Sequence, residues 1–292
     1  MKILIIGNGF LGAAIEEKLY REGHEILFFA RTRSAKVESR QVLGTVFNYE
    51  EFVKVFDWKP QVVIHTAWIT TPGVYRDHSS NIQYAEFTSK LAKTVSNSDI
   101  EHLIILGTCA EYGRQVKPST AGQTKISPST LYAQQKVVAF DSAQQLLKES
   151  NVRLTWARVF YPYGLNQDRN RLIPRIIHSI EEGNQIVLAD TSSVYDWITT
   201  RDIASAISWV LEHELPTEID IGTSNGFTNL ELLIALENLL ATANQTLSQS
   251  HHDYGLNEVF VAGENSPLFM SGWSPRDTLD SGLEWVLGHE KT

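Results

Sequence analysis

The sequence predicts an α/β protein with a Rossmann-type doubly wound parallel sheet and a smaller C-terminal lobe. Three observations predict this class. Short apolar runs alternate with helical patterns from the first residue, a glycine-rich turn follows the first run, and 42% of the 292 residues are hydrophobic, as in ordinary globular proteins. Apolar runs that alternate with amphipathic helices are typical of parallel β-α-β units, whose strands are buried on both faces.

The first half of the chain supplies the strands and helices of such a sheet. Lys2–Ile6 is predicted as a strand, and apolar residues at helical spacing from Leu11 predict a helix that ends at Gly23. Further strands are expected at Glu25–Phe29, Pro60–His65, His102–Leu106 and Arg153–Val159, with helices at Asn81–Val95 and Thr130–Leu147.

The pattern changes after Phe160. We expect a Rossmann domain over residues 1–160 and a smaller lobe over residues 161–292, some of whose segments return to the sheet. The elements expected in the second part are a loop at Tyr161–Gly164, strands at Gln185–Ala189 and Glu218–Gly222, and helices at Asp202–Leu211 and Asn229–Leu240.

Charge and cysteine content exclude several classes of partner. The net charge of −9 argues against nucleic acid or anionic lipid as the main partner. Cys109 is the single cysteine, so an internal disulfide is impossible and a reducing compartment fits best. The first residues lack the features of a signal peptide, and no stretch approaches the ~18 apolar residues of a membrane span. We therefore expect a cytoplasmic protein.

The glycine-rich turn predicts dinucleotide binding. Gly7, Gly9 and Gly12 fit the pattern G-x-G-x-x-G, and Phe10 and Leu11 open the helix that follows. The first glycine makes the turn, the second lets the backbone approach a pyrophosphate, and the third lets helix and strand pack closely. The N–H groups at the helix N-terminus can then bind the phosphates. The alternative is a strand–helix turn without a ligand.

The residues after the second strand favour NADP over NAD. An acidic residue there binds the ribose 2′-hydroxyl of NAD, whereas arginine accommodates the 2′-phosphate of NADP. Here the strand leads into Ala30, Arg31, Thr32 and Arg33, without an acid. Two guanidinium groups suit a phosphate. NAD is the alternative cofactor, with the arginines then in a solvated basic loop.

A tyrosine and a lysine predict proton-transfer chemistry. Tyr132 and Lys136 are four residues apart on an expected helix and so share one face. A nearby ammonium is expected to lower the tyrosine pKa from its free value of about 10, so that the phenol exchanges protons at neutral pH. Thr108 follows an expected strand, at the edge where α/β sheets bind ligands, and its hydroxyl could reach the same substrate oxygen.

These motifs together resemble the extended short-chain dehydrogenase/reductase superfamily, and most nearly the NAD-dependent epimerase/dehydratase family, which acts on nucleotide sugars. The likeness covers about Met1 to Gly222. The segments that carry it, in chain order, are the glycine loop, His65-Thr66-Ala67, Asn81, Thr108–Gly113, Tyr132-x-x-x-Lys136, Arg158–Gly164, Asn170–Pro174, Asp196–Ile198 and Arg201-Asp202.

The resemblance implies roles for further residues. Thr66 and Ala67 match the strand end that lines the cofactor. The positions that match the substrate side of the family are Tyr161, Asn170, Arg171 and Arg201. The resemblance also implies a homodimer formed through a pair of helices.

Three departures from the family narrow the chemistry. The glycine loop is one residue shorter than the usual G-x-x-G-x-x-G, and Tyr161 stands where asparagine is common. Nucleotide-sugar 4,6-dehydratases carry Asp-Glu after the threonine, whereas this chain has Cys109 and Ala110. Glu111 comes one position too late to substitute, so dehydratase chemistry is not expected.

Two other candidates are weaker. Adjacent histidines point apart, so His251-His252-Asp253 is interpreted as a polar loop, and no metal is expected. Cys109 has no evident helper base and is interpreted as a small buried thiol.

The predicted function is reduction of a 4-keto-6-deoxy sugar on a nucleotide, with catalytic residues Thr108, Tyr132 and Lys136. Tyr132 delivers the proton, Lys136 lowers its pKa and holds the nicotinamide ribose, and Thr108 orients the carbonyl oxygen. A nucleotide-sugar 4-epimerase that keeps NAD tightly bound is one alternative. The other is a non-catalytic redox sensor on the same fold.

Overall fold

The structure is a computed structural model that describes residues 1–35, 38–188, 190–240 and 257–290. Its centre is a seven-stranded parallel sheet in the order β10-β6-β5-β4-β1-β2-β3, which confirms the Rossmann-type class. The strands are β1 (Lys2–Ile6), β2 (Glu25–Ala30), β3 (Arg40–Leu43), β4 (Val62–His65), β5 (His102–Thr108), β6 (Arg153–Val159) and β10 (Glu218–Ile221). Every neighbouring pair is parallel.

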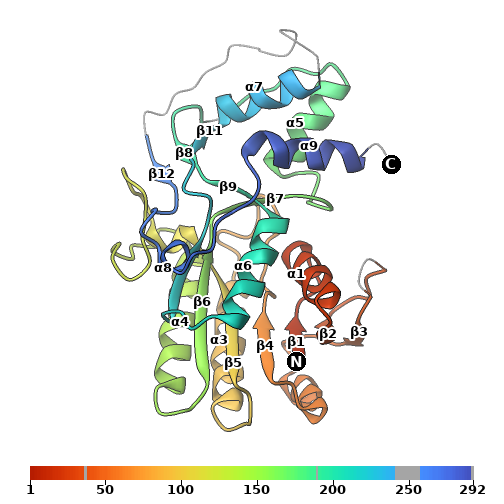
Figure 1. The fold of residues 1–292 in the computed structure, drawn as a ribbon, viewed down its shortest axis with the longest axis vertical. Helices are drawn as coiled ribbons and strands as arrows, with labels where there is room; N and C mark the ends of the chain where they lie inside the picture. The colour runs from red at the N-terminus through yellow and green to blue at the C-terminus, as the bar shows by residue number, and fades with distance from the viewer. Residues whose placement is uncertain (36–37, 189, 241–256, 291–292) are drawn as a thin grey trace.

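Helices cover both faces of this sheet (Figure 1). One face is covered by α3 (Ser80–Val95) and α4 (Leu131–Leu147), and the other by α1 (Phe10–Arg21) and α6 (Thr200–Glu212). Alternation along β1 makes this possible, because Leu4 faces the first layer and Ile3 and Ile5 face the second. The strands are therefore apolar on both sides, which is why they form near-continuous apolar runs in the sequence.

Several short elements in the first part of the chain are absent from the sequence-based expectation. These are β3, the helix α2 (Tyr49–Phe52), the 3₁₀ helix η1 (Val53–Trp58) and the 3₁₀ helix η2 (Cys109–Tyr112). Each is at most six residues long. Such segments are too short to produce a recognisable apolar period.

The smaller lobe lies beyond the carboxyl ends of the central strands, at the top of Figure 1. Its strands are β7 (Tyr161–Tyr163) paired with β9 (Trp197–Thr199), and β8 (Val194–Tyr195) between β11 (Phe227–Thr228) and β12 (Val259–Phe260). Its helices are α5 (Leu172–Glu181), α7 (Asn229–Leu239), the short α8 (Pro267–Met270) and α9 (Leu279–Glu290). A separate apolar core joins α5, α7 and α9, while α6 and β10 return to the central sheet.

In the second part of the chain, the expected helices Asp202–Leu211 and Asn229–Leu240 and the expected strand Glu218–Gly222 are confirmed as α6, α7 and β10, whereas other expected elements are wrong. Tyr161–Gly164 was expected as a loop, but its first three residues form β7 through pairing with β9, more than thirty residues along the chain. Residues 185–188 form no strand, and Ala189 lies outside the described residues. The pattern also missed α5, in which a proline at the third position separates the buried Ile173 from the other buried isoleucines. Within the described ranges, no helix is long and apolar enough to cross a membrane.

Candidate active site

The predicted site residues gather at the carboxyl ends of the central strands. Gly7 follows β1, Thr66 follows β4, and Thr108 is the last residue of β5. Because these strands are parallel neighbours, their carboxyl ends lie at one edge of the sheet, where open α/β sheets bind ligands. The smaller lobe lies over the same edge (Figure 1).

The glycine loop fits a dinucleotide phosphate. Gly7 has a positive φ of 101°, and a Cβ there would lie 2.8 Å from Thr66 Oγ1. A Cβ on Gly12 would collide with the Gly7 carbonyl oxygen. A Cβ on Gly9, in contrast, would meet no atom within 4 Å. The fold itself thus needs Gly7 and Gly12, whereas Gly9 keeps open the space in front of the N-terminus of α1, where a pyrophosphate would approach.

The end of β4 is fixed to this loop. The Thr66 hydroxyl donates to the carbonyl oxygens of Ile6 and Gly7, at 3.0 and 2.9 Å. The Ala67 backbone nitrogen would lie 2.9 Å from a Cβ on Gly7. Thr66 and Ala67 therefore border the glycine loop directly, in the position that lining a bound cofactor requires.

The structure places Arg31 and Arg33 on the exposed loop after β2. The side-chain amide of Asn8, in the glycine loop, donates to the carbonyl oxygen of Thr32 at 2.6 Å, so the two loops are joined. Glu16 on α1 accepts from the Ser39 backbone N–H and hydroxyl and is buried. Its carboxylate is therefore used inside the fold.

Thr108 and Tyr132 are brought together. The Thr108 side chain lies within hydrogen-bonding range of the Tyr132 phenol and lowers its pKa, although the two residues are on different elements. Thr130 caps the N-terminus of α4 by accepting from the Ala133 N–H, which fixes the turn that carries Tyr132. The half-buried Tyr132 ring packs edge-on against Tyr75, with 5.0 Å between ring centroids.

Lys136 is buried beneath this pair. Its Nζ donates to the Leu106 carbonyl oxygen at 2.6 Å and lies 3.8 Å from the centre of the Trp68 ring. Burial lowers the pKa of Lys136 to about 7, against the opposing effect of the Glu111 carboxylate.

The pKa of Tyr132 shifts in the direction opposite to the sequence-based expectation. That expectation was a phenol pKa lowered by the Lys136 ammonium. In the structure burial raises the Tyr132 pKa, the neighbouring Tyr75 adds to the increase, and only the hydrogen bond from Thr108 opposes it. Desolvation of the phenolate is the larger effect here, because the charged form loses contact with water.

Glu111 is committed to the interior of the protein. It is fully buried, and its carboxylate accepts from the Thr108 N–H at 2.8 Å and from Trp156 Nε1 at 3.0 Å. It also forms an ion pair with Arg158, 2.6 Å from Nε. The carboxylate is therefore occupied by protein donors and does not face the Tyr132 hydroxyl as a free acid or base.

The predicted substrate residues separate into two groups. Tyr161 contacts Tyr195, with 4.7 Å between ring centroids, and Arg171 lies 5.2 Å from the centre of the Tyr75 ring. Arg171 also donates to the Thr70 carbonyl oxygen, so the N-terminus of α5 is joined to the chain that follows β4. Arg171 is thereby connected through Tyr75 to the Tyr132 ring, whereas Tyr161 packs against Tyr195, Trp197 and Phe260.

Arg201 and Asn170 have other partners. Arg201 forms a bidentate ion pair with Asp277, and its guanidinium lies 4.2 Å from the centre of the Trp285 ring. Its charge is thus neutralised within the lobe, and these contacts join α6 to α9. Asn170 is exposed and its backbone and side-chain nitrogens donate to Asp168 Oδ1.

The chain between β4 and α3 supplies site residues that sequence reasoning missed. Trp68, Tyr75 and Arg76 lie here, and Tyr75 and Trp68 both pack against Tyr132. The available signal was the length of this connection and its aromatic residues directly after a strand, because connections at strand carboxyl ends commonly form sites.

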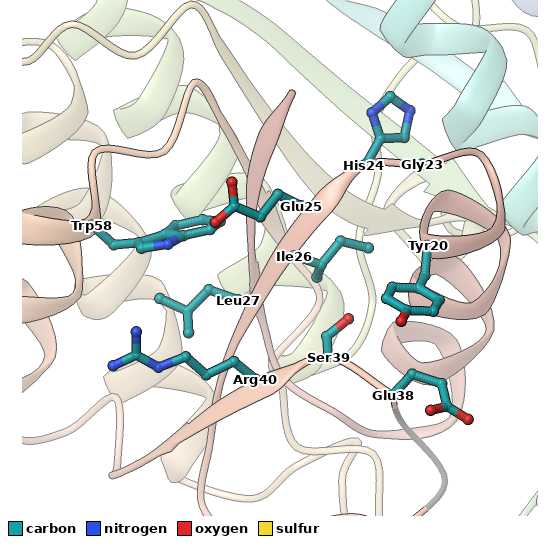
Figure 2. Close-up of a pocket in the computed structure, with 10 residues that line it drawn as sticks. All are labelled: Tyr20, Gly23, His24, Glu25, Ile26, Leu27, Glu38, Ser39, Arg40 and Trp58. Atoms are coloured by element: carbon teal, nitrogen blue, oxygen red, sulfur yellow. The ribbon is translucent and has the colours of Figure 1, made fainter.

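A surface hollow lies at another place on the molecule. It has a volume of about 680 Å³ and is lined at the amino ends of β2 and β3 by Tyr20, Gly23, His24, Glu25, Ile26, Leu27, Glu38, Ser39, Arg40 and Trp58. Figure 2 shows Trp58 and Arg40 on one side of β2 and Tyr20 on the other. Since Arg31 lies at the opposite end of β2, this hollow is separate from the candidate site.

A metal centre has no support in the part of the chain that the structure describes. There, no group of three or more histidine, cysteine, aspartate or glutamate side chains is arranged to hold a metal ion. His251, His252 and Asp253 lie outside the described residues.

Comparison with known proteins gives consistent matches. A model of the NAD dependent epimerase/dehydratase family matches residues 3–222. The chain is 20% identical to UDP-glucose 4-epimerase of Streptococcus mutans, over 94% of this chain and 92% of that protein. It is also 20% identical to UDP-glucuronic acid decarboxylase 1 of Danio rerio, over 97% of this chain and 71% of that protein.

Solved structures share the fold over the whole chain. UDP-glucose 4-epimerase of Thermotoga maritima, solved with UDP-glucose, has a TM-score of 0.86 at 20% identity, with 100% of this chain and 99% of that one covered. The dTDP-glucose 4,6-dehydratase of Bacillus anthracis, solved with NAD, has a TM-score of 0.83 at 24% identity, with 100% and 97% covered. At these identities the likeness concerns the fold.

Proposed function

The chain belongs to the NAD-dependent epimerase/dehydratase family, and on that premise we propose that it reduces the carbonyl group of a 4-keto-6-deoxy sugar carried on a nucleotide. The observation that carries the proposal is the proximity of the Thr108 hydroxyl to the Tyr132 phenol, with Lys136 buried one turn further along α4. This arrangement lies at the sheet edge beside the glycine loop, so that cofactor and substrate can meet there.

The residues of the chain supply the proton and the orientation, and a bound nicotinamide cofactor supplies the hydride. Tyr132 donates its proton to the carbonyl oxygen, and the Thr108 hydroxyl binds the same oxygen. Lys136 lies one turn further along α4, and at a pKa of about 7 it can return a proton to Tyr132 at neutral pH. Gly7, Gly9, Phe10, Leu11, Gly12, Thr66 and Ala67 hold the cofactor.

The protonation state of Tyr132 fits the proposed role. Because burial raises its pKa, the phenol is protonated at neutral pH, which is the form that donates a proton to a carbonyl. The preference for a reductase over an epimerase rests on Arg31 and Arg33, which favour NADPH as a cofactor that is exchanged in each turnover.

The 4-epimerase is the second candidate, because UDP-glucose 4-epimerases stand among the similar proteins. Such an enzyme would keep NAD bound and return the hydride to the other face of the sugar. Release of NAD from purified, denatured protein separates the candidates, since a reductase exchanges its cofactor in each turnover. The third candidate is a non-catalytic redox sensor. In such a protein the Thr108–Tyr132 pair would have no role.

For the cofactor we propose NADP(H). The support is the exposed Arg31 and Arg33 after β2, together with the absence of an acid from that strand end. For the substrate side we propose Tyr161, Arg171 and Asn170. Tyr161 packs against Tyr195, Arg171 lies over the Tyr75 ring, and Asn170 lies beside Arg171 on an exposed turn. We also propose that the protein is a cytoplasmic homodimer. Sedimentation velocity would measure the mass of the assembly.

A direct assay tests the proposed function. Purified protein is mixed with NADPH and with UDP-, dTDP- or GDP-linked 4-keto-6-deoxy sugars, and oxidation of the nicotinamide is followed by absorbance. We expect NADPH consumption with at least one of these sugars and a 6-deoxy sugar product. Conversion of UDP-glucose to UDP-galactose by protein that carries NAD, without NADPH consumption on any keto sugar, would establish the epimerase instead.

A further inference from the structure

The backbone of Arg76 is fixed beside the catalytic tyrosine. Arg76 lies in the connection between β4 and α3, and its carbonyl oxygen accepts from the Tyr132 N–H at 2.8 Å. The Tyr132 N–H is in the first turn of α4, where backbone donors have no partner within the helix. The backbone of Arg76 is therefore held next to the backbone of Tyr132.

The side chain of Arg76 reaches three tyrosines. Arg76 is exposed, and its guanidinium lies near the Tyr75 phenol and near the side chains of Tyr161 and Tyr195. Burial raises the pKa of Tyr161 and of Tyr195 above the usual value for a phenol, so both are uncharged at neutral pH. Neutral phenols accept hydrogen bonds from a guanidinium but leave its positive charge uncompensated.

These tyrosines are held in place by their own contacts. The Tyr195 hydroxyl donates to Asp190 Oδ2 at 2.6 Å, and the ring of Tyr161 packs edge-on against that of Tyr195. Tyr75 is fixed between the guanidinium of Arg171 on its ring face and the Tyr132 ring. The side chains of Tyr75, Tyr161 and Tyr195 are thus held in place before any ligand binds.

No carboxylate neutralises Arg76 in the described part of the chain. Arg114, Arg158 and Arg201 each form an ion pair with a glutamate or aspartate, whereas none involves Arg76. In a chain of net charge −9, an exposed arginine next to Tyr75 that lacks such a partner is a candidate ligand for an external anion.

We propose that Arg76 binds an anionic oxygen group of the substrate beside the Tyr132 hydroxyl. This inference rests on the proposed action on a nucleotide sugar and adds a specificity residue to it. The planar guanidinium carries five N–H donors, enough for a bidentate contact with an anion in addition to a contact with Tyr75. The anion can be a carboxylate on the sugar or the phosphate attached to it.

Binding measurements on the full chain with saturating NADPH test this proposal. The probes are UDP, UDP-glucose and UDP-glucuronic acid, titrated by calorimetry into the wild type and into Arg76→Gln. Arg21→Gln is the matched control, because Arg21 is an exposed arginine at the end of α1 that forms an ion pair with Glu17 on its own helix. Thermal midpoint and NADPH affinity report whether Arg76→Gln folds as the wild type does.

The expected result is a loss of at least about tenfold in affinity for Arg76→Gln, with no loss for Arg21→Gln. Loss confined to UDP-glucuronic acid identifies the sugar carboxylate, and an equal loss for all three probes identifies the phosphate. Arg76→Lys should recover part of the affinity, with a stronger dependence on salt. Equal binding by the wild type and Arg76→Gln overturns the role of Arg76 alone. A wild type that binds none of the probes overturns the nucleotide-sugar function and this inference with it.

Discussion

Glu111 and Arg158 form an ion pair at 2.6 Å in which neither side chain is exposed to solvent. Arg158 also contacts Glu218 at 2.6 Å, and Glu111 accepts from Trp156 Nε1. The pair joins η2, which follows the catalytic Thr108, to β6 and β10. Cys109 occupies the position of a dehydratase acid, and Glu111 lies two residues after it. The Glu111 carboxylate thus joins structural elements beside the candidate site instead of acting in catalysis.

Removal of Glu111 is expected to destabilise the protein strongly. In Glu111→Ala the Arg158 charge stays buried without its main partner, and the expected loss is about 3–5 kcal/mol in the free energy of unfolding. Urea denaturation measures this loss. The control is Glu17→Ala, which removes an exposed ion pair with Arg21 and should cost at most about 1 kcal/mol. Similar losses for the two variants would show that the buried pair contributes little.

A second prediction is that the protein lacks 4,6-dehydratase activity. Elimination of water needs an acid and a base after Thr108, whereas Cys109 and Ala110 occupy those positions and Glu111 is bound inside. Purified protein with NAD and dTDP-glucose is therefore expected to give no 4-keto-6-deoxy product, detected by its absorbance in alkali. Product formation would mean that another residue supplies the acid.

The sequence predicted the central sheet well because its signal is local. Apart from β3, whose residues are exposed or half-buried, the strands are buried on both faces. A continuous apolar run such as His102–Leu106 therefore marks such a strand without reference to any partner. The lobe lacks that signal. Its strands are two or three residues long and exist only through pairings such as β7 with β9, which no local pattern encodes.

The candidate site divides in the same way. The spacing of Tyr132 and Lys136 and the strand before Thr108 were enough to place these residues near one another. The pKa of Tyr132 was not predictable, because it depends on burial by Tyr75 and other residues far apart in the chain. The pairing of Arg201 with Asp277 was equally hidden, since it links residues 76 positions apart.

Tyr132→Phe is expected to remove catalysis while leaving the fold intact. The variant loses only the phenol oxygen that donates the proton, so kcat should fall by about 10²-fold or more. Thermal midpoint and NADPH affinity should stay close to the wild-type values. Tyr20→Phe is the matched control, because Tyr20 is 47% exposed on α1. Steady-state kinetics that place kcat of Tyr132→Phe within about threefold of the wild type would exclude Tyr132 as the proton donor.

His65 is expected to make stability depend on pH. Burial, together with the nearby Lys136 charge, lowers the pKa of His65 to about 3, against about 6.5 in the unfolded chain. Between these values the unfolded state binds a proton that the folded state does not. The stabilisation linked to the neutral His65 is therefore complete above pH 6.5. As the pH falls towards 3, it decreases by about 1.4 kcal/mol of unfolding free energy per pH unit.

Urea unfolding of the wild type and His65→Gln from pH 7 to pH 4 measures that contribution. On acidification, the free energy of unfolding of the variant should fall less steeply than that of the wild type. The difference in slope corresponds to about one bound proton. His102→Gln should behave alike, because burial and Arg153 also lower the pKa of His102 to about 3. Parallel curves for all three proteins would show that neither histidine is linked to folding in this range.

The cofactor prediction rests on the end of β2. Ala30 ends that strand, and the exposed Arg31 and Arg33 follow it where an acid would bind the ribose 2′-hydroxyl of NAD. A charge-assisted contact to a 2′-phosphate contributes on the order of 1.5 kcal/mol, about tenfold in affinity. NADPH should therefore bind at least about tenfold more tightly than NADH at low salt, and the difference should narrow as salt screens the contact.

Arg31→Ala tests whether the arginine causes this preference. The variant should lose NADPH affinity and keep NADH affinity nearly unchanged, because only the 2′-phosphate distinguishes the two cofactors. Arg40→Ala is the matched control, since Arg40 is an exposed arginine at the amino end of β3, beside the hollow of Figure 2. Fluorescence titration of both cofactors gives the four affinities. An NADH preference that survives Arg31→Ala would assign the arginines to a solvated loop and make the 4-epimerase the leading candidate.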